Sequence, residues 1–173
     1  YNDLDVIAGQ ASIGLELLEQ ADDFDVVVVA AGGGGLISGV AAAIKRARPA
    51  VRIVGASPVN DAALAASVAA GRVVEIEAAP TLSDCTAGGL EAGAVTVELA
   101  RDLVDDWVLV SEDEIAAALR LVIDSQHQLV EGAAATAVAA AHRYAAPGGR
   151  IVVVSCGANI SADTLARALG RPA

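Results

Sequence analysis

The feature of this sequence that most directly indicates chemistry is a run of four glycines at 32–35. It follows a β-branched run at 25–31 and precedes a helical pattern at 36–48. Glycines allow unusual backbone angles and a close approach of a ligand, and the first turn of a helix offers unpaired N–H groups at a positive dipole end. We therefore expect an anion site made of backbone. A tight βα turn is the alternative, but four glycines exceed what a turn requires, since each costs conformational entropy.

The class of phosphate ligand is narrowed by what surrounds the glycines. A P-loop is excluded because no Gly-Lys-Ser/Thr follows. A dinucleotide fingerprint is imperfect, since Gly33, Gly35 and Gly39 give G-x-G-x-x-x-G. The end of the next expected strand, 54–57, lacks the carboxylate that would bind a ribose. The NAD interpretation is weakened accordingly.

Two other residues stand where strands or helices begin or end. Cys156 follows an expected strand at 151–154, where a thiol could face a ligand or serve as a small buried hydrophobe. Glu131 precedes an expected helix at 132–144, where its charge would complement the helix dipole. No chemistry is expected of three further residues, which lie in a polar loop or on solvated helix faces: Cys85, His127 and His142.

Alternating strands and helices must position these residues. Short apolar or β-branched runs predict strands at 25–31, 51–56, 73–77, 107–110 and 151–154. Helical patterns fall at 10–20, 36–48, 60–70, 93–103, 115–128, 132–144 and 161–169, with a capping box at 111–114 and a turn at 147–149. Strands separated by helices imply βαβ units. We expect an α/β fold, a parallel twisted sheet with helices on both faces, as one domain over 1–173.

Composition excludes several classes of protein. Hydrophobic residues make up 55% of the 173, too many for disorder, yet no apolar run is long enough to span a membrane. The net charge of −11 and the 2% of aromatic residues disfavour nucleic acid and anionic membrane surfaces as partners. The two cysteines have no metal-type spacing, and the acidic, polar N-terminus is unlike a signal peptide. A reducing cytoplasm is the expected location.

Four motifs in order carry a resemblance to a known family. They are Ala-Gly-Gln-x-x-Ile-x-Leu-Glu at 8–16, Gly-Gly-Gly-Gly-Leu at 32–36, Glu-Gly at 131–132 and Ser-Cys-Gly-Ala-Asn at 155–159. This series resembles the threonine/serine dehydratase and serine racemase family, pyridoxal-phosphate (PLP) enzymes of fold type II. The resemblance covers nearly the whole chain and corresponds to the C-terminal portion of such enzymes.

The resemblance implies PLP as the cofactor and assigns residues to it. The glycine loop would hold the phosphate, Cys156 would face the pyridine nitrogen, and Asn159 would organise the loop around it. A neutral partner there leaves the ring nitrogen largely unprotonated, which suits β-elimination or racemisation. The residues expected to bind the cofactor are Gly32, Gly33, Gly34, Gly35, Leu36, Gly89, Glu131, Cys156 and Gly157. For Gly89 a turn glycine, and for Glu131 dipole complementation, remain the alternatives.

The activity that the resemblance implies is deamination of threonine or serine to a 2-oxo acid and ammonia. A racemase of the same family is one alternative. A non-catalytic nucleotide-binding, phosphate-binding or interaction module is the other. A small amino acid is the expected substrate, and a homo-oligomer the expected assembly.

The sequence departs from the family in its lysine. The family's Schiff-base lysine lies in an N-terminal segment that has no counterpart here, so no catalytic residue is assigned within the chain. The single lysine, Lys45, falls late in the expected helix 36–48 and is interpreted as a solvated cation at the helix end. We expect the chain alone to be inactive, as a fragment, as half of a split enzyme with a partner chain, or as a degenerate relative. The absence of methionine favours a fragment.

A second departure concerns metal. Some family members bind a divalent cation through a carboxylate that follows the second strand. Here Ser57 occupies that place, and Asp61 is close but out of register. A hydroxyl is a poor ligand for a hard cation compared with a carboxylate, so no metal site is expected.

Overall fold

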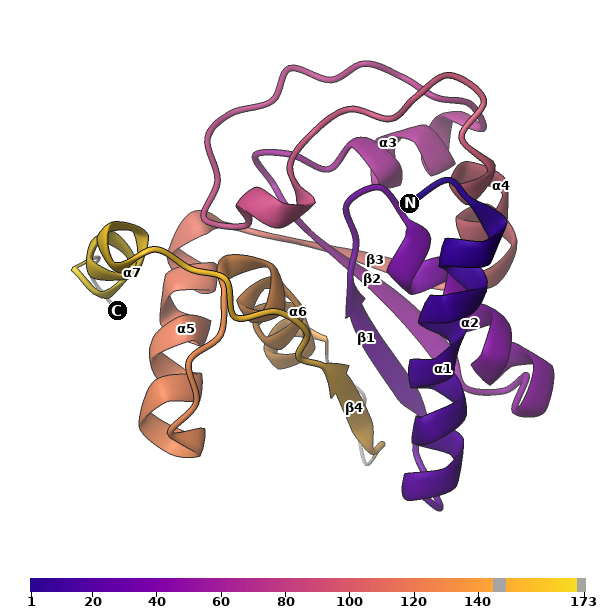
Figure 1. Cartoon of the computed structure of the whole chain (residues 1–173), viewed down its shortest axis with the longest axis horizontal. Coiled ribbons are helices and arrows are strands. Elements are labelled where there is room, and N and C mark those ends of the chain that lie inside the picture. Colours follow the sequence, from indigo (N-terminus) through magenta and orange to yellow (C-terminus); the bar gives the residue numbers. More distant parts are fainter. Residues whose placement is uncertain (145–148, 171–173) are drawn as a thin grey trace.

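The computed structural model describes residues 1–144 and 149–170 (Figure 1). Four parallel strands form one sheet in the order β3-β2-β1-β4. Their bounds are β1 Val26–Ala30, β2 Arg52–Pro58, β3 Asp106–Val110 and β4 Ile151–Val154. Val26 pairs with Arg52 on one side and with Ile151 on the other. The expected parallel sheet is confirmed, and all its carboxyl ends lie at one edge.

Helices cover both faces of the sheet (Figure 1). One face carries α1 Leu4–Gln20, α2 Gly35–Ala47, α3 Ala63–Ala70 and α4 Val95–Leu103, and the other α5 Glu112–Gln126, α6 Gly132–Arg143 and α7 Ala162–Leu169. The strand β1 shows why two layers form. Val27 and Val29 pack toward α2 and α4, whereas Val26 and Val28 pack toward α5 and α6. A strand that is apolar on both faces requires cover on both.

The helix starts follow local capping chemistry. The side chain of Asp3 accepts from the N–H groups of Asp5 and Val6, so α1 begins earlier than the expected residue 10. The capping box at Ser111 and Glu114 is confirmed at the start of α5. No helix among the described residues combines the length and the apolar character that a membrane span needs.

The expected strand at 73–77 is wrong. Its alternating pattern is present, but the N–H of Val74 donates to Ser67 Oγ at 3.1 Å instead of to a neighbouring strand. Just beyond the stretch, the N–H of Ala79 donates to the carbonyl of Asn60 at 2.9 Å. These bonds hold the chain outside the sheet. The stretch 71–94 therefore crosses the carboxyl edge of the sheet with no regular structure except the short 3-10 helix Asp84–Thr86. The expected turn at 147–149 lies mostly outside the described residues.

Candidate cofactor site

The glycine run forms the connection from β1 to α2. Gly34 is the N-cap of α2 with φ of 95°, a left-handed conformation that favours glycine, and no side chain caps the helix. No described residue accepts a hydrogen bond from the N–H groups of Gly32, Gly33 or Gly34. The first turn of α2 holds no acidic residue. Free N–H groups at a positive helix end make a site for an anion.

Two other segments close around the glycines and leave no room for a β-carbon. At Gly32 a Cβ would meet the backbone of Thr86 at 2.8 Å, and at Gly33 it would strike the ring of Tyr1. Thr86 therefore contributes a wall from the 71–94 stretch. Tyr1 contributes one from the N-terminus, where its hydroxyl accepts from the N–H of Glu91 at 2.9 Å. Bare backbone at the base and side chains around it define a cradle.

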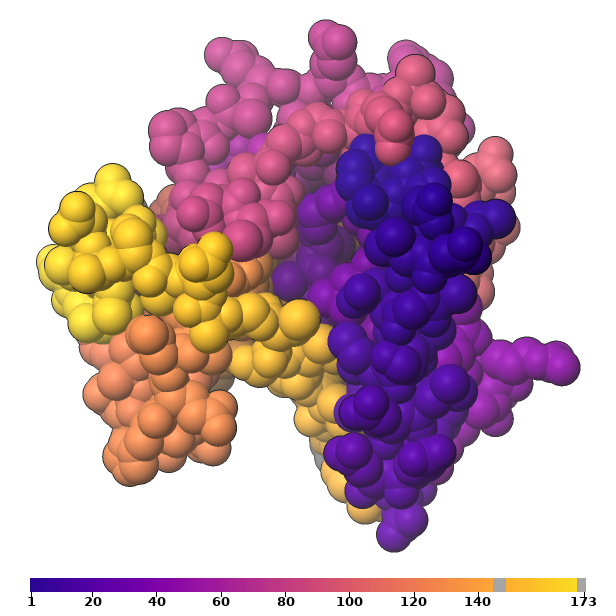
Figure 2. Space-filling view, viewed as in Figure 1, coloured from indigo at the N-terminus to yellow at the C-terminus, as the bar shows by residue number. Residues whose placement is uncertain are grey.

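A cavity of about 250 Å³ opens above this cradle. Figure 2 shows it between the indigo N-terminal segment, the magenta stretch and the yellow C-terminal segment. Eight of the nine residues expected at the cofactor line it: Gly32, Gly33, Gly34, Gly35, Leu36, Glu131, Cys156 and Gly157. Gly89 does not line it. The assignment of all nine residues to the cofactor stays a prediction. Three residues for which the sequence offers no chemical signal also line the cavity, namely Tyr1, Cys85 and Thr86.

Glu131 binds the loop after β4 and does not cap its own helix by a hydrogen bond. Its expected contact with the cofactor and the alternative, dipole complementation, both stay predictions. Glu131 is the N-cap of α6, but its buried carboxylate makes no cap bond. Instead it accepts from the N–H of Asn159 at 2.8 Å, while its own N–H donates to the carbonyl of Gly157 at 3.1 Å. Gly157 has φ of 103°, and a β-carbon there would lie 2.5 Å from the Glu131 carboxylate. The loop after β4 and the start of α6 are thus bound to each other beside the cradle.

Two free thiols line the cavity. Cys156 follows the last strand and is exposed, as is Cys85. A hydrogen bond to Glu131, then burial and the charges of Glu131 and Asp84, raise the pKa of the Cys85 thiol to about 11. Cys85 is therefore a neutral thiol at physiological pH. Nothing in the residues next to it signals this, because Glu131 lies far along the chain.

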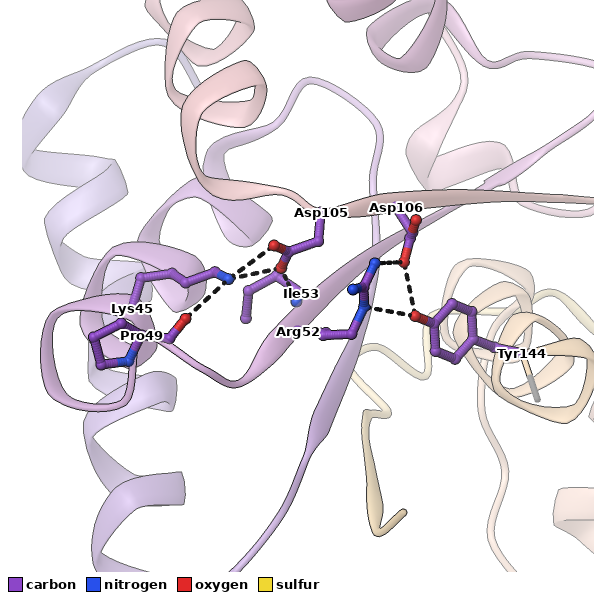
Figure 3. A network of polar contacts seen from close by, with 7 residues as sticks. All are labelled: Lys45, Pro49, Arg52, Ile53, Asp105, Asp106 and Tyr144. Carbon is purple, nitrogen blue, oxygen red and sulfur yellow. Dashed lines mark hydrogen bonds and ion pairs between the residues drawn. The ribbon is translucent and has the colours of Figure 1, made fainter. Parts of the chain in front are cut away.

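Lys45 is in the last turn of α2, beside the amino ends of β2 and β3 (Figure 3), whereas the cradle follows the carboxyl end of β1. Its ammonium group pairs with Asp105 at 2.7 Å and donates to the carbonyl of Pro49 at 3.5 Å. Asp105 also accepts from the N–H of Ile53 at 2.6 Å, just inside β2. The side chain of Lys45 is only 19% exposed. The expectation of a solvated cation was therefore wrong in part: Lys45 is in the last turn of α2, but it is ion-paired and packed.

A second polar group stands at the same amino edge (Figure 3). Arg52 pairs with Asp106, and the hydroxyl of Tyr144 donates to Asp106 at 2.7 Å. Burial alone would raise the pKa of the Asp106 carboxyl, but the hydrogen bonds from Tyr144 and Arg52 outweigh it and lower this pKa. The ion pairs thus stabilise one edge of the sheet, and the cavity occupies the other.

The position considered for a metal has a different local role. Ser57 is buried and its hydroxyl donates to the carbonyl of Ala31 at 2.9 Å. Asp61 accepts from the N–H of Gly88 at 2.7 Å. Among the residues that the structure describes, no three His, Cys, Asp or Glu side chains converge as a metal site would need. The expectation of no metal stays a prediction.

Comparison with known proteins identifies the family. The model of the family described as pyridoxal-phosphate dependent enzyme matches residues 1–157. The chain belongs to this family. It is 43% identical over 158 residues to a putative threonine dehydratase of Sinorhizobium fredii, a match that covers 90% of this chain and 48% of the relative. It is 40% identical over 172 residues to the L-threonine ammonia-lyase of Thermotoga maritima, over 99% of this chain and 43% of the relative.

Solved structures agree with the sequence relatives. The processed form of threonine deaminase isoform 2 from Solanum lycopersicum superposes with a TM-score of 0.89 at 32% identity, over 98% of this chain and 50% of that one. Maize serine racemase gives 0.83 at 34% identity, over 95% and 52%. The expected fold type II PLP family is confirmed. The chain spans about half the length of the relatives it matches.

The cradle fits the cofactor of this family. PLP carries a phosphate, which suits free N–H groups at a helix start, and the glycine run lines an open cavity together with Tyr1. The volume of about 250 Å³ is near the lower bound of about 300 Å³ for small-molecule pockets. Cys156 and Glu131 line the same space.

Proposed function

We propose that this chain forms the cofactor-binding portion of a PLP-dependent ammonia-lyase that converts threonine or serine to a 2-oxo acid and ammonia. The observation that carries the proposal is the convergence of the glycine cradle, Cys156 and Glu131 on one cavity. The similarity to threonine ammonia-lyases over 99% of the chain supports this substrate class.

In this proposal the residues of the cavity divide the cofactor between them. The N–H groups of 32–36 bind the phosphate, and their hydrogen bonds orient it without a cation. The Cys156 thiol would face the ring nitrogen, and Gly157 leaves room for the Glu131 carboxylate, which a β-carbon there would meet at 2.5 Å. Glu131 keeps the loop 157–159 in place through the N–H of Asn159. Bound PLP supplies the electron sink that stabilises a carbanion at the amino acid's α-carbon.

The same proposal gives Lys45 no part in the chemistry. Its ion pair with Asp105 lies at the amino edge of the sheet, whereas the cradle lies at the carboxyl edge. We infer that the lysine that binds the cofactor covalently belongs to another part of a longer protein or to a partner chain, and that the 173 residues alone do not catalyse the reaction.

The test is to add PLP to the purified chain, record its visible absorbance, reduce with borohydride and measure the intact mass. We expect saturable PLP binding with no covalent adduct. Lys45→Arg serves as the control and is expected to bind PLP as the wild type does. A stoichiometric adduct that Lys45→Arg abolishes would refute the account of Lys45. No binding at all would refute the cofactor proposal.

A racemase is the second candidate, because maize serine racemase superposes with a TM-score of 0.83. The two activities differ in their product. Chiral analysis of serine after incubation with the chain joined to a lysine-bearing partner segment would distinguish them: D-serine supports a racemase, and pyruvate with ammonia supports the lyase.

A further inference from the structure

The wall of the cofactor cavity that Cys85 and Thr86 form belongs to the long irregular stretch 71–94. This stretch arches over the carboxyl edge of the sheet between α3 and α4 (Figure 1). Within 75–93 regular hydrogen bonding is limited to the 3-10 helix Asp84–Thr86. Something outside the stretch must therefore fix the position of this wall, because so few bonds within it do.

Part of that support comes from Glu112, which accepts from the N–H of Leu82 at 2.6 Å before the 3-10 helix. The residues directly after β2 supply the rest. The side-chain amide of Asn60 donates to the carbonyl of Pro80 at 2.6 Å, and the backbone carbonyl of Asn60 accepts from the N–H of Ala79 at 2.9 Å. The neighbouring Asp61 accepts from the N–H of Gly88 at 2.7 Å. Two adjacent residues thus hold the stretch on both sides of the 3-10 helix.

Asp61 is unusual among the carboxylates of the chain because it is only 4% exposed. No ion pair is formed by its carboxylate among the residues that the structure describes. A carboxylate without a cation is costly to bury unless it is hydrogen-bonded, and a hydrogen bond to a charged acceptor is stronger than a neutral one. The bond to Gly88 is therefore a substantial constraint on the stretch.

This constraint reaches the cradle over two residues. Gly88 is two positions from Thr86, whose hydroxyl donates to the carbonyl of Ser83 at 2.9 Å and whose backbone abuts Gly32. Cys85 in turn contacts the carboxylate of Glu131. A displacement of Gly88 would withdraw both Thr86 and Cys85 from the cavity.

We propose that Asp61 is a positioning residue of the cofactor site: its buried carboxylate fixes Gly88 and so holds the wall of Cys85 and Thr86 against the glycine cradle. The effect of Asp61 on cofactor binding rests on the proposed function. The placement of the wall does not, because it follows from the contacts of the chain itself.

The test compares Asp61→Ala, which removes the acceptor, with Asp61→Asn, which keeps an oxygen at the same place. Asp163, exposed on α7, supplies the matched control Asp163→Ala. The first readout is the rate at which iodoacetamide alkylates Cys85, measured by peptide mapping. In Asp61→Ala the rate should rise, by up to about 100-fold if the pKa of the thiol falls from about 11 to its ordinary 9.0. Asp61→Asn and Asp163→Ala should stay close to the wild type.

Two further readouts separate the placement of the wall from cofactor binding. Hydrogen exchange of 84–90 should accelerate in Asp61→Ala, and the Kd for PLP should rise about tenfold. If the wild type binds no PLP, the proposed function fails while the alkylation and exchange results still stand. If Asp61→Ala resembles Asp163→Ala in both alkylation and exchange, the inference about Asp61 is refuted.

A second variant covers the case in which Asp61→Ala does not fold. Gly88 has φ of 131° and open space around its missing side chain, so Gly88→Ala strains the backbone without a clash. It should accelerate alkylation of Cys85 in the same direction. Unchanged alkylation in Gly88→Ala would count against the inference.

Discussion

The close crossing of α1 and α2 leads us to predict that a single added methyl group can lower the stability of the chain. Gly39 is in the middle of α2, and a β-carbon there would fall well inside contact distance of the Ile7 carbonyl and 2.8 Å from the nitrogen of Ala11. Both of these are backbone atoms of α1, so no side chain rotation relieves the overlap. We predict that Gly39→Ala destabilises the chain although alanine favours helices.

The magnitude follows from two opposing effects. Alanine gains about 1 kcal/mol over glycine in a helix interior. Overpacking in a well-packed core costs typically about 1–3 kcal/mol, and the upper end applies because a whole helix must move. The net loss is then about 2 kcal/mol. With a urea m-value of about 2 kcal/mol/M, the unfolding midpoint should fall by about 1 M.

The matched control is Gly9→Ala in α1. Gly9 is equally internal to its helix, but nothing lies within 4 Å of its missing β-carbon. This substitution should raise the midpoint by a few tenths of a molar, since only the helix preference of about 0.5–1 kcal/mol acts. Urea unfolding followed by circular dichroism measures both. A midpoint for Gly39→Ala at or above that of the wild type would refute the packing argument.

Three further predictions concern the site and the edge opposite it. Gly157→Ala should weaken PLP binding about tenfold, measured by absorbance titration, because positive φ and the Glu131 carboxylate both oppose a β-carbon. Glu131→Gln should accelerate iodoacetamide alkylation of Cys85 at pH 8, since the main cause of its raised pKa is lost; an unchanged rate contradicts this. Because the pKa of Asp106 is lowered in the folded state, its carboxylate stabilises the fold above pH 3.8, and this stability is lost as the pH falls through the folded-state pKa. Asp106→Asn should therefore reduce the change in urea stability between neutral and acid pH, whereas the exposed control Asp102→Asn should not.

The layout of strands and helices was predictable from the sequence because its causes are local. The run of valines in β1 is apolar on both faces, which only a covered parallel strand explains. Ser111 and Glu114 cap each other over three residues. The apolar pattern at 73–77 also predicted a strand but was misleading. Ser67 and Asn60 accept hydrogen bonds from backbone N–H groups in and just after this stretch, which a neighbouring strand would otherwise have paired.

From local chemistry alone, the site was predictable only where the backbone itself would do the binding. Cys156 and Glu131, which also line the cavity, were expected from the family resemblance. The glycine run indicates an anion cradle with no knowledge of the fold, because its N–H groups and its freedom of φ are intrinsic. The walls were not predictable in this way. Cys85 and Thr86 reach the cavity through Asp61 and Gly88, a contact across 27 residues. The role of Glu131 depends on the loop after β4, which follows it by 28 residues at Asn159.

Ion pairs lie at the amino edge of the sheet and the backbone cradle lies at its carboxyl edge. This separation explains how such an acidic chain can hold an anionic cofactor. The net charge of −11 opposes a phosphate at long range, but salt screens that repulsion beyond about 8 Å at physiological ionic strength. The lysine is committed to Asp105 at the amino edge and cannot offset the charge at the cradle. Neither lysine nor arginine is among the described residues that line the cavity, so the attraction must come from fixed N–H groups and the end of α2, which need no side chain and do not titrate. A site built in this way depends on backbone position above all, which is why the walls and the glycines that admit them matter more here than any single charge.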